Sequence, residues 1–205
     1  AASQDVAGNG GLDDVGGHGT AVSFTIAGRR NDAGTHGIAF DATIVSFRAD
    51  TPGSCAGADP EDDDSGCSFN DNAIATGIDA ARVAGVRVIN ISLGGDPPNA
   101  AVRNALDRAT AAGIIIVLSA GNDGTEPQGT DPDPFAAIAT NTAISRGLII
   151  IAGSVGANDS RTPGGDVIST FSNRAGTGQN FYLAAVGERI RAPDHTNTPF
   201  LWSGT

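Results

Sequence analysis

Apolar residues in the central part of the chain follow two alternating patterns. Helical spacing, with apolar residues three or four positions apart, occurs in three stretches: 70–84, 99–112 and 135–146. Short continuous apolar runs, rich in β-branched residues, occur between them: 86–91, 114–118 and 148–152. Continuous runs of this length indicate strands that are covered on both faces. Helices alternating with such strands predict an α/β fold with a mostly parallel sheet and helices on both of its faces.

Near the N-terminus, glycines mark the two ends of a predicted element. Residues 16–28, GGHGTAVSFTIAG, predict a short helix that begins at His18 after a glycine loop and ends before Gly28. The ordinary pKa of histidine lies nearest neutrality, so a well-placed imidazole can move protons, although a capping or core histidine explains the segment equally well. Asp13 and Asp14 are close to His18 in the sequence, and either could orient the imidazole, but on a flexible glycine loop we expect a solvated turn. A short strand is predicted over 42–47.

Composition limits the class of protein. The chain has 205 residues, of which 40% are hydrophobic, and this is enough for one domain with a substantial core. Its 23 acidic and 12 basic residues give a net charge of −11, which argues against nucleic acid as a partner. No apolar run reaches the roughly 18 residues of a membrane span, and no signal segment opens the chain. In a secreted protein, that would mean the chain has already been processed.

Both cysteines lie in a polar stretch, 50–68, which we interpret as an acidic insertion. Cys55 and Cys67 do not form a CxxC pair, which argues against zinc or thioredoxin chemistry. We predict a local disulfide between them and hence an oxidising compartment, with two free thiols as the alternative. The acidic run at 59–64 is expected to be solvated, since it lacks the spacing of a specific calcium loop.

Two glycine-rich turns follow two of the predicted strands. SLGG occupies 92–95, directly after the strand at 86–91, and SAGNDG occupies 119–124, after the strand at 114–118. In open parallel sheets, ligands bind beyond the carboxyl ends of the strands. The turns therefore mark the edge of the sheet at which we expect the site.

Five motifs occur along the chain in one order: GHGTAV at 17–22, NISLGG at 90–95, SAGND at 119–123, FSNRAG at 171–176 and WSGT at 202–205. Together they resemble the subtilisin-like serine proteases, the subtilases. The segment THGIAFDATIVSFRAD at 35–50, together with the cysteine-bearing insertion, resembles the passenger domains of bacterial autotransporter subtilases. The resemblance implies a three-layer subtilisin-like fold, endopeptidase activity on polypeptides, and a location outside the cell or on the bacterial surface.

The resemblance also assigns roles to single residues. His18 matches the general base, and Asn122 matches the side-chain donor of the oxyanion hole. One wall of the substrate cleft, the strand edge that pairs with the substrate backbone, would consist of Ser92, Leu93 and Gly94. The opposite wall of the specificity pocket would consist of Ser119, Ala120 and Gly121. Its floor is expected from 125–135, where the match to the family fades.

A loop at 29–35 resembles the calcium loop of the family. Asn31 would offer its side chain there, and oxygen ligands of this kind suit calcium. The aspartate ligand of the family would lie upstream of residue 1. The chemistry itself would need no cofactor, so structural calcium is the one metal that the resemblance implies.

Two family motifs are missing from these residues. Subtilases carry their triad in the order Asp, His, Ser, yet no strand ending in Asp-Thr-Gly or Asp-Ser-Gly precedes His18. The Gly-Thr-Ser motif is present only as Gly204-Thr205. We therefore interpret residues 1–205 as one partial catalytic domain, incomplete at both ends and inactive alone. An uncovered apolar groove would then favour self-association.

Two other functions remain as alternatives. A peptide-binding pseudoprotease would use the 90–95 edge without catalysis. An α/β-hydrolase would use Ser92 as nucleophile and His195 as base, but its nucleophile turn requires glycine where Asn90 stands. His36 and His195 have no partner spacing and are expected at the surface. No P-loop or dinucleotide-binding motif is present.

Overall fold

The computed structural model describes residues 2–32, 34–57, 66–156 and 166–205. They form two compact units, one made of Ala1–Ala84 with Ile190–Trp202 and one made of Gly85–Arg189 with Ser203–Thr205. We call these the first unit and the second unit and describe each by itself. The acidic run at 59–64 lies outside the described residues.

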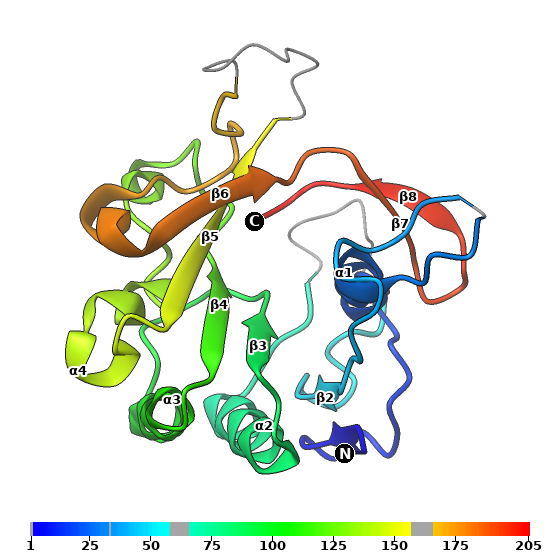
Figure 1. Cartoon of the computed structure of the whole chain (residues 1–205), viewed down its shortest axis with the longest axis horizontal. Helices are drawn as coiled ribbons and strands as arrows, with labels where there is room; N and C mark the ends of the chain where they lie inside the picture. Colours follow the sequence, from blue (N-terminus) through cyan, green and yellow to red (C-terminus); the bar gives the residue numbers. More distant parts are fainter. Residues whose placement is uncertain (1, 33, 58–65, 157–165) are drawn as a thin grey trace. The chain divides into compact units, whose positions relative to one another are not determined.

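The second unit is built on a parallel sheet with four strands (Figure 1). In spatial order the strands are β3 (Val88–Ile91), β4 (Ile115–Ser119), β5 (Ile149–Val155) and β6 (Tyr182–Val186). Two rows of neighbours cross one face: Ile89 with Ile116 and Ile149, and Ile91 with Leu118 and Ile151. All six are at most 9% exposed. The apolar runs of the sequence thus supply this core, and the three predicted strands are confirmed with small shifts of their ends.

Helix α3 (Ala100–Ala111) contacts β4 and supplies the other half of this core. It begins where predicted, because the side chain of Asn99 accepts a hydrogen bond from the backbone of Val102 at 3.0 Å. Its fully buried residues follow the i, i+3, i+4, i+7 spacing of one helix face: Val102, Ala105, Leu106 and Ala109. This helix confirms the helical pattern at 99–112.

The single helix predicted over 135–146 is wrong. The structure has a 3₁₀ helix, η3 (Ala136–Thr140), followed by a four-residue helix, α4 (Thr142–Ser145). Asn141 separates them with a non-helical ψ of 89°. Asparagine and threonine compete for backbone hydrogen bonds, which explains the break despite the helical spacing. The described part of this unit also has two further 3₁₀ helices, η2 (Pro127–Thr130) and η4 (Gly176–Phe181).

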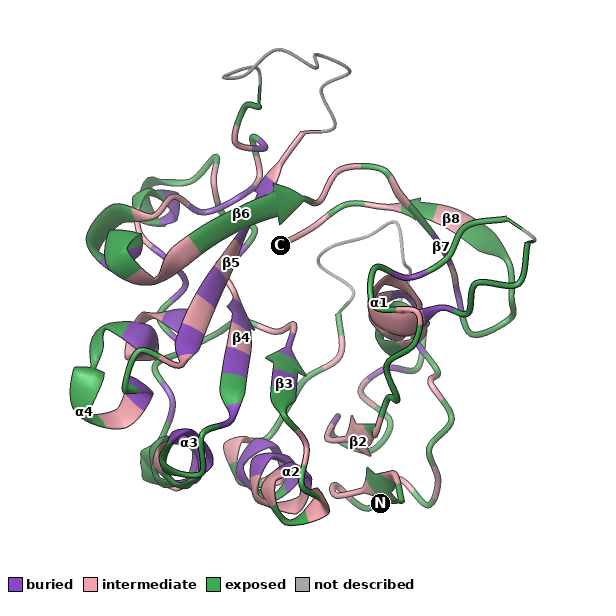
Figure 2. Ribbon diagram, viewed as in Figure 1, coloured by how far each residue is buried: buried purple, intermediate pink, exposed green. Residues whose placement is uncertain are grey.

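The opposite face of the sheet is more open than the face that α3 covers. Val88 and Ile115 are register partners on this face and are 53% and 37% exposed. Edge strand β6, which sequence reasoning missed, is exposed along most of its length, with Leu183 at 62% (Figure 2). An apolar surface of this kind is the feature on which the predicted self-association would depend.

In its described residues, the first unit has two α-helices and two small sheets (Figure 1). The helices are α1 (His18–Ala27) and α2 (Asp71–Ala84), which confirms both predictions within one residue. A parallel pair joins β1 (Gln4–Asp5) to β2 (Phe47–Arg48), and an antiparallel hairpin joins β7 (Ile190–Pro193) to β8 (Pro199–Trp202). The strand predicted over 42–47 is wrong in extent, because pairing with β1 begins only at Phe47.

The disulfide predicted between Cys55 and Cys67 is present, across 12 residues of sequence. It adjoins a buried ion pair, since Cys55 Sγ lies 3.3 Å from a carboxylate oxygen of Asp50. Asp50 is 7% exposed and accepts two hydrogen bonds from Arg48, at 2.8 and 3.1 Å. The paired carboxylate raises the pKa of the Arg48 guanidinium. A charge pair of this geometry offsets part of the cost of its own burial.

Candidate active site

His18 is the first residue of α1 and follows a glycine in the left-handed conformation. Gly17 has a φ of 80°, which a side chain would strain. A Cβ there would also lie 3.2 Å from both Asp194 Cβ and His195 Nδ1, in the turn between β7 and β8. Glycine is therefore required at 17 by conformation and by space. The loop that delivers His18 is held against a hairpin that sequence reasoning did not predict.

Asp14 caps the helix that carries His18, so the expectation of a solvated turn is wrong for this residue. Its carboxylate accepts hydrogen bonds from the backbone of Gly17 at 3.0 Å and of Thr20 at 2.6 Å. The Thr20 hydroxyl donates a third, also at 2.6 Å. The first N–H groups of a helix have no partner within it, and a carboxylate is the strongest acceptor available for them. Asp14 thereby fixes the start of α1.

The environment of His18 favours a neutral imidazole. The residue is exposed to solvent, yet the protein atoms around it partly desolvate the imidazole. This desolvation lowers the pKa of His18, and the negative charge of Asp14 opposes the change without cancelling it. An imidazole that is neutral near pH 7 can accept a proton, which a general base must do.

We expect Asp14→Asn to lower the pKa of His18 further, because the substitution removes the charge that favours the imidazolium. The lost charge-assisted bonds to Gly17 and Thr20 should also reduce the free energy of unfolding by about 1 kcal/mol. An NMR titration of the imidazole resonances measures the first effect, and denaturant unfolding measures the second. Asp13→Asn is the matched control. A His18 pKa that is unchanged in Asp14→Asn would contradict the assignment.

Asn122 lies just beyond β4, in the second unit. Its side-chain oxygen accepts hydrogen bonds from both the backbone N–H and the hydroxyl of Thr205, each at 3.1 Å. A backbone N–H can only donate, so it fixes which side of the amide carries the oxygen. The NH₂ group is the other branch of the same amide, and within the described part of the chain it donates to no protein acceptor. A fixed, unused amide donor is what an oxyanion hole needs.

Asn173 stabilises the loop that carries Asn122, and the sequence did not predict this role. It is 1% exposed, and its backbone N–H donates to the carbonyl of Gly121 at 2.9 Å. Its side chain accepts from the backbone of Asp123 at 2.7 Å and donates to the carbonyl of Asp131 at 3.1 Å. Asn173 thus holds the backbone on both sides of Asn122. The FSNRAG motif was the available signal, because it places an amide where a buried polar group needs several partners.

The two predicted walls of the substrate cleft lie at the same edge of the sheet. Residues 92–94 follow β3, and residues 119–121 include the end of β4 and the turn after it. β3 and β4 are parallel neighbours, with Ile91 beside Leu118 in the register. The hydroxyls of Ser119 and Thr205 are 2.6 Å apart, so the WSGT motif also reaches this edge. Three of the five motifs therefore meet at the carboxyl ends of neighbouring strands.

A match to a family model identifies the family of the chain. The model of the subtilase family, Peptidase S8, matches residues 2–200. The chain belongs to the subtilase family. This membership agrees with the arrangement of motifs in the second unit and with the glycine loop before His18.

Curated relatives of this subtilase are bacterial subtilisins. It is 37% identical to subtilisin DY of Bacillus licheniformis over 114 residues, which are 53% of this chain and 42% of that protein. It is 32% identical to subtilisin of Bacillus pumilus over 165 residues, which are 77% of this chain and 54% of that protein. The chain thus spans about half the length of these relatives.

Solved structures confirm the fold class. Sphericase matches with a TM-score of 0.72 and 24% identity, over 98% of this chain and 63% of that chain. The self-cleaved protease domain of PatA matches with a TM-score of 0.66 and 22% identity, over 94% and 63%. At this level of identity the likeness concerns the fold. It supports the predicted three-layer α/β arrangement.

The predicted catalytic residues of this subtilase belong to different units. His18 is in the first unit, while Asn122 and both predicted walls are in the second. The structure therefore describes the surroundings of each group separately. The convergence of His18 and Asn122 stays a prediction.

The fit of calcium to the loop at 29–35 is incomplete. Asn31 and Asp32 are exposed there, and residue 33 lies outside the described part. Calcium takes six to eight oxygen ligands. Between residues 2 and 205, leaving out the undescribed segments, no group of three or more His, Cys, Asp or Glu is placed to hold a metal. Backbone carbonyl and amide oxygens are further calcium ligands, and a calcium role for Asn31 stays a prediction.

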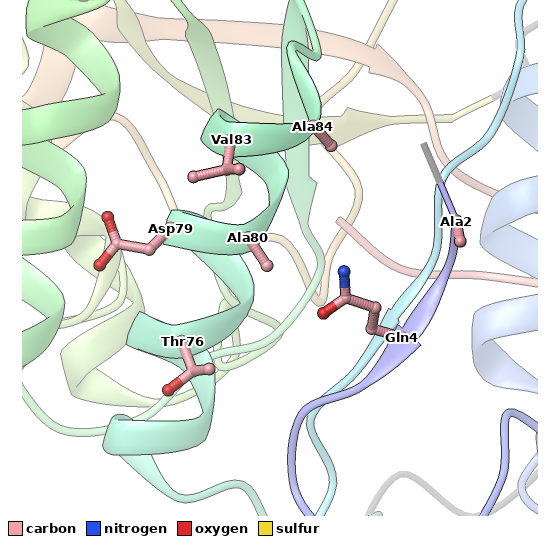
Figure 3. Close-up of a pocket in the computed structure, with 7 residues that line it drawn as sticks. All are labelled: Ala2, Gln4, Thr76, Asp79, Ala80, Val83 and Ala84. Atoms are coloured by element: carbon pink, nitrogen blue, oxygen red, sulfur yellow. The ribbon is translucent and has the colours of Figure 1, made fainter.

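A hollow of about 620 Å³ lies elsewhere in the first unit, between β1 and α2 (Figure 3). Gln4 faces it from β1, and small or apolar residues of α2, such as Ala80 and Val83, form the other side. Asp79 at its rim pairs with Arg82 at 3.4 Å. None of the predicted site residues lines this hollow, so it is not the candidate active site.

No helix among the described residues is long and apolar enough to cross a membrane.

Proposed function

We propose that the protein carrying these residues is a serine endopeptidase that hydrolyses peptide bonds of polypeptides outside the cell or at the bacterial surface, as an autotransporter-type subtilase does. Family membership and the bacterial subtilisins support the reaction class. The observation that carries the proposal is the amide of Asn122, whose oxygen is held by Thr205 while its NH₂ group stays unused. Self-association of the 205-residue polypeptide through an uncovered apolar groove remains part of the proposal.

In this mechanism the substrate backbone pairs with the edge at 92–94, which gives affinity independent of sequence. His18 takes the proton from the serine hydroxyl as that oxygen attacks the scissile carbonyl, and later gives it to the leaving amine. The carbonyl oxygen becomes negatively charged, and the NH₂ group of Asn122 donates to it. Because this charge exists only in the transition state and the intermediate, the donor raises the rate more than the affinity.

A serine-directed fluorophosphonate probe tests the proposal. The full-length protein is expected to react once per active site, at a serine outside residues 1–205, while the 205-residue polypeptide alone stays unlabelled because it contains no Gly-Thr-Ser motif. Mass spectrometry identifies the labelled residue. Stoichiometric labelling of the 205-residue polypeptide, or a full-length protein that does not react, would overturn the proposal.

A further inference from the structure

Asn173 holds the backbone on both sides of Asn122, and its own backbone carbonyl is held by two hydroxyl groups of the second unit. The hydroxyl of Tyr182 donates to this carbonyl at 2.7 Å, and the hydroxyl of Ser172 donates at 3.1 Å. A carbonyl oxygen has two lone pairs, so the two hydroxyls satisfy it completely. Asn173 is 1% exposed, and a buried polar group of this kind keeps the orientation that its partners define.

The hydroxyl of Tyr182 reaches Asn173 by lying across strand β5. Tyr182 is the first residue of β6 and is the register partner of Ile151 in β5. Two residues further along β5, a Cβ on Gly153 would overlap the phenol of Tyr182. Glycine at 153 therefore leaves the space that the phenol needs to reach Asn173. The next four residues of β6 are exposed, so Tyr182 is the residue through which this edge strand acts on the Asn122 loop.

The Asn122 loop also has a support that does not involve Tyr182. The backbone N–H of Asp133 donates to the carbonyl of Ala120 at 2.7 Å, and the buried carboxylate of Asp133 accepts from the backbone of Gly95 at 3.1 Å. Loss of the Tyr182 hydroxyl should therefore loosen the Asn122 loop without unfolding it. A loosened loop allows the amide of Asn122 to leave the position in which it can donate.

We propose that Tyr182 is a positioning residue for the oxyanion donor: its hydroxyl fixes Asn173, and Asn173 fixes the amide of Asn122. This inference rests on the proposed endopeptidase function and adds a residue to its machinery. A misplacement of about 1 Å near a reacting group can cost about 10²-fold in rate, so even a partial loosening is measurable. Because the donor acts on charge that develops in the transition state, the loss should concern kcat rather than KM.

The test is a double-mutant cycle in the full-length protein, with Tyr182→Phe and Asn122→Ala alone and together. Tyr182→Phe keeps the ring and removes the hydroxyl. We expect it to lower kcat about 3- to 10-fold with little change in KM, the range for one neutral hydrogen bond. In the Asn122→Ala background it should change kcat less than about twofold, because no donor is left to position. Titration of active sites with the fluorophosphonate probe normalises kcat to the folded fraction of each variant.

Ser169→Ala is the matched control for loss of a buried hydroxyl. Ser169 is 2% exposed, and its hydroxyl lies 2.7 Å from that of Ser154, whereas the Tyr182 hydroxyl binds the carbonyl of Asn173. The variant removes a hydrogen bond from the same part of the unit, so its stability should decrease while kcat stays within about twofold of the parent value. If Ser169→Ala lowered kcat as much as Tyr182→Phe, the effect would be a general loosening and the proposal would be overturned.

The outcomes distinguish this proposal from the proposed function. If the unmodified protein cleaves no peptide and does not react with the fluorophosphonate probe, the endopeptidase function fails and the proposal fails with it. If the protein is active and Tyr182→Phe leaves kcat unchanged, or lowers it equally with and without Asn122, only the role of Tyr182 is overturned. Should Tyr182→Phe not fold, Ser172→Ala permits the same comparison, since it removes the other donor to the Asn173 carbonyl. An equal loss of kcat with and without Asn122, or no loss, would overturn the proposal there too.

Discussion

Replacing His18 by alanine is expected to lower kcat of the full-length protein about 10⁶-fold while KM changes little. The size of the effect is the one known for the general-base histidine of subtilisin, and it is carried over from that relative. The physical reason is that a serine hydroxyl is a weak nucleophile until a base takes its proton. Because α1 begins at His18 and is capped by Asp14, the variant should keep its fold. Steady-state hydrolysis of a peptide amide measures the loss.

The other two histidines provide matched controls. His36 stacks edge-on against Phe40, with 5.2 Å between ring centroids, and His195 is exposed in the turn after β7. Alanine at His36 should leave kcat within a few fold of the parent value. If the His36 or His195 variant lost as much activity as the His18 variant, the general base would be assigned to the wrong imidazole.

The pH profile tests the same residue without a substitution. His18 acts in its neutral form, so activity is present above its pKa and is lost as pH falls through it. Desolvation lowers the pKa of His18. The acid limb of kcat/KM should therefore have its midpoint below about 6.5, the ordinary value for histidine. A midpoint above that value would contradict the electrostatic description of the site.

Replacing Asn122 by alanine is expected to lower kcat about 10²- to 10³-fold, again with little change in KM. This figure was established in subtilisin and is carried over from that relative. The hydrogen bonds from Thr205 hold the amide of Asn122 in one orientation, so the donor needs no rearrangement when charge develops. The loss should therefore concern the chemical step. Pre-steady-state and steady-state kinetics on one peptide amide separate this step from binding.

Asn180, exposed in η4, offers the matched control for this substitution. Its alanine variant should behave as the parent protein. Thr205→Ala should have an intermediate effect, since it removes one of the two bonds that orient the amide and retains the backbone donor. If Asn122→Ala raised KM and left kcat unchanged, Asn122 would be a substrate-binding residue. Its assignment as the donor to the oxyanion would then be wrong.

Sequence patterns predicted the helices and strands that are determined by the residues within them. The helices at α1, α2 and α3 follow from apolar spacing with Gly28 and Asn99 at their ends, and β3, β4 and β5 follow from continuous apolar runs. The break at Asn141 was missed because apolar spacing alone does not register backbone competition from polar side chains.

Elements that depend on distant partners were not predicted. Strand β1 has two residues and exists through its pairing with β2, more than forty residues later. The turn of the β7–β8 hairpin is stabilised by the buried carboxylate of Asp194. This carboxylate accepts hydrogen bonds from the backbone N–H groups of Thr196 and Thr198, each at 2.8 Å. A local pattern carries little information about such contacts, because their register is set by tertiary packing.

In the candidate site, too, local motifs were predicted and contacts between distant residues were not. His18 and Asn122 were identified because they stand in short motifs. The residues that hold the site in shape were not, since the contacts of Asp14, Asp133 and Asn173 become apparent only when loops meet in space. Each has a buried or capping role that an isolated Asp or Asn in a sequence does not reveal.

A crystal structure of the full-length protein with a peptide boronate on its serine tests the central claim most directly. Such a ligand places a negative oxygen where the tetrahedral intermediate carries one. We predict that the NH₂ group of Asn122 lies about 2.7–3.1 Å from that oxygen, and that a ring nitrogen of His18 lies within hydrogen-bond distance of the serine oxygen. A structure in which either side chain is directed away from the bound boronate would contradict the account.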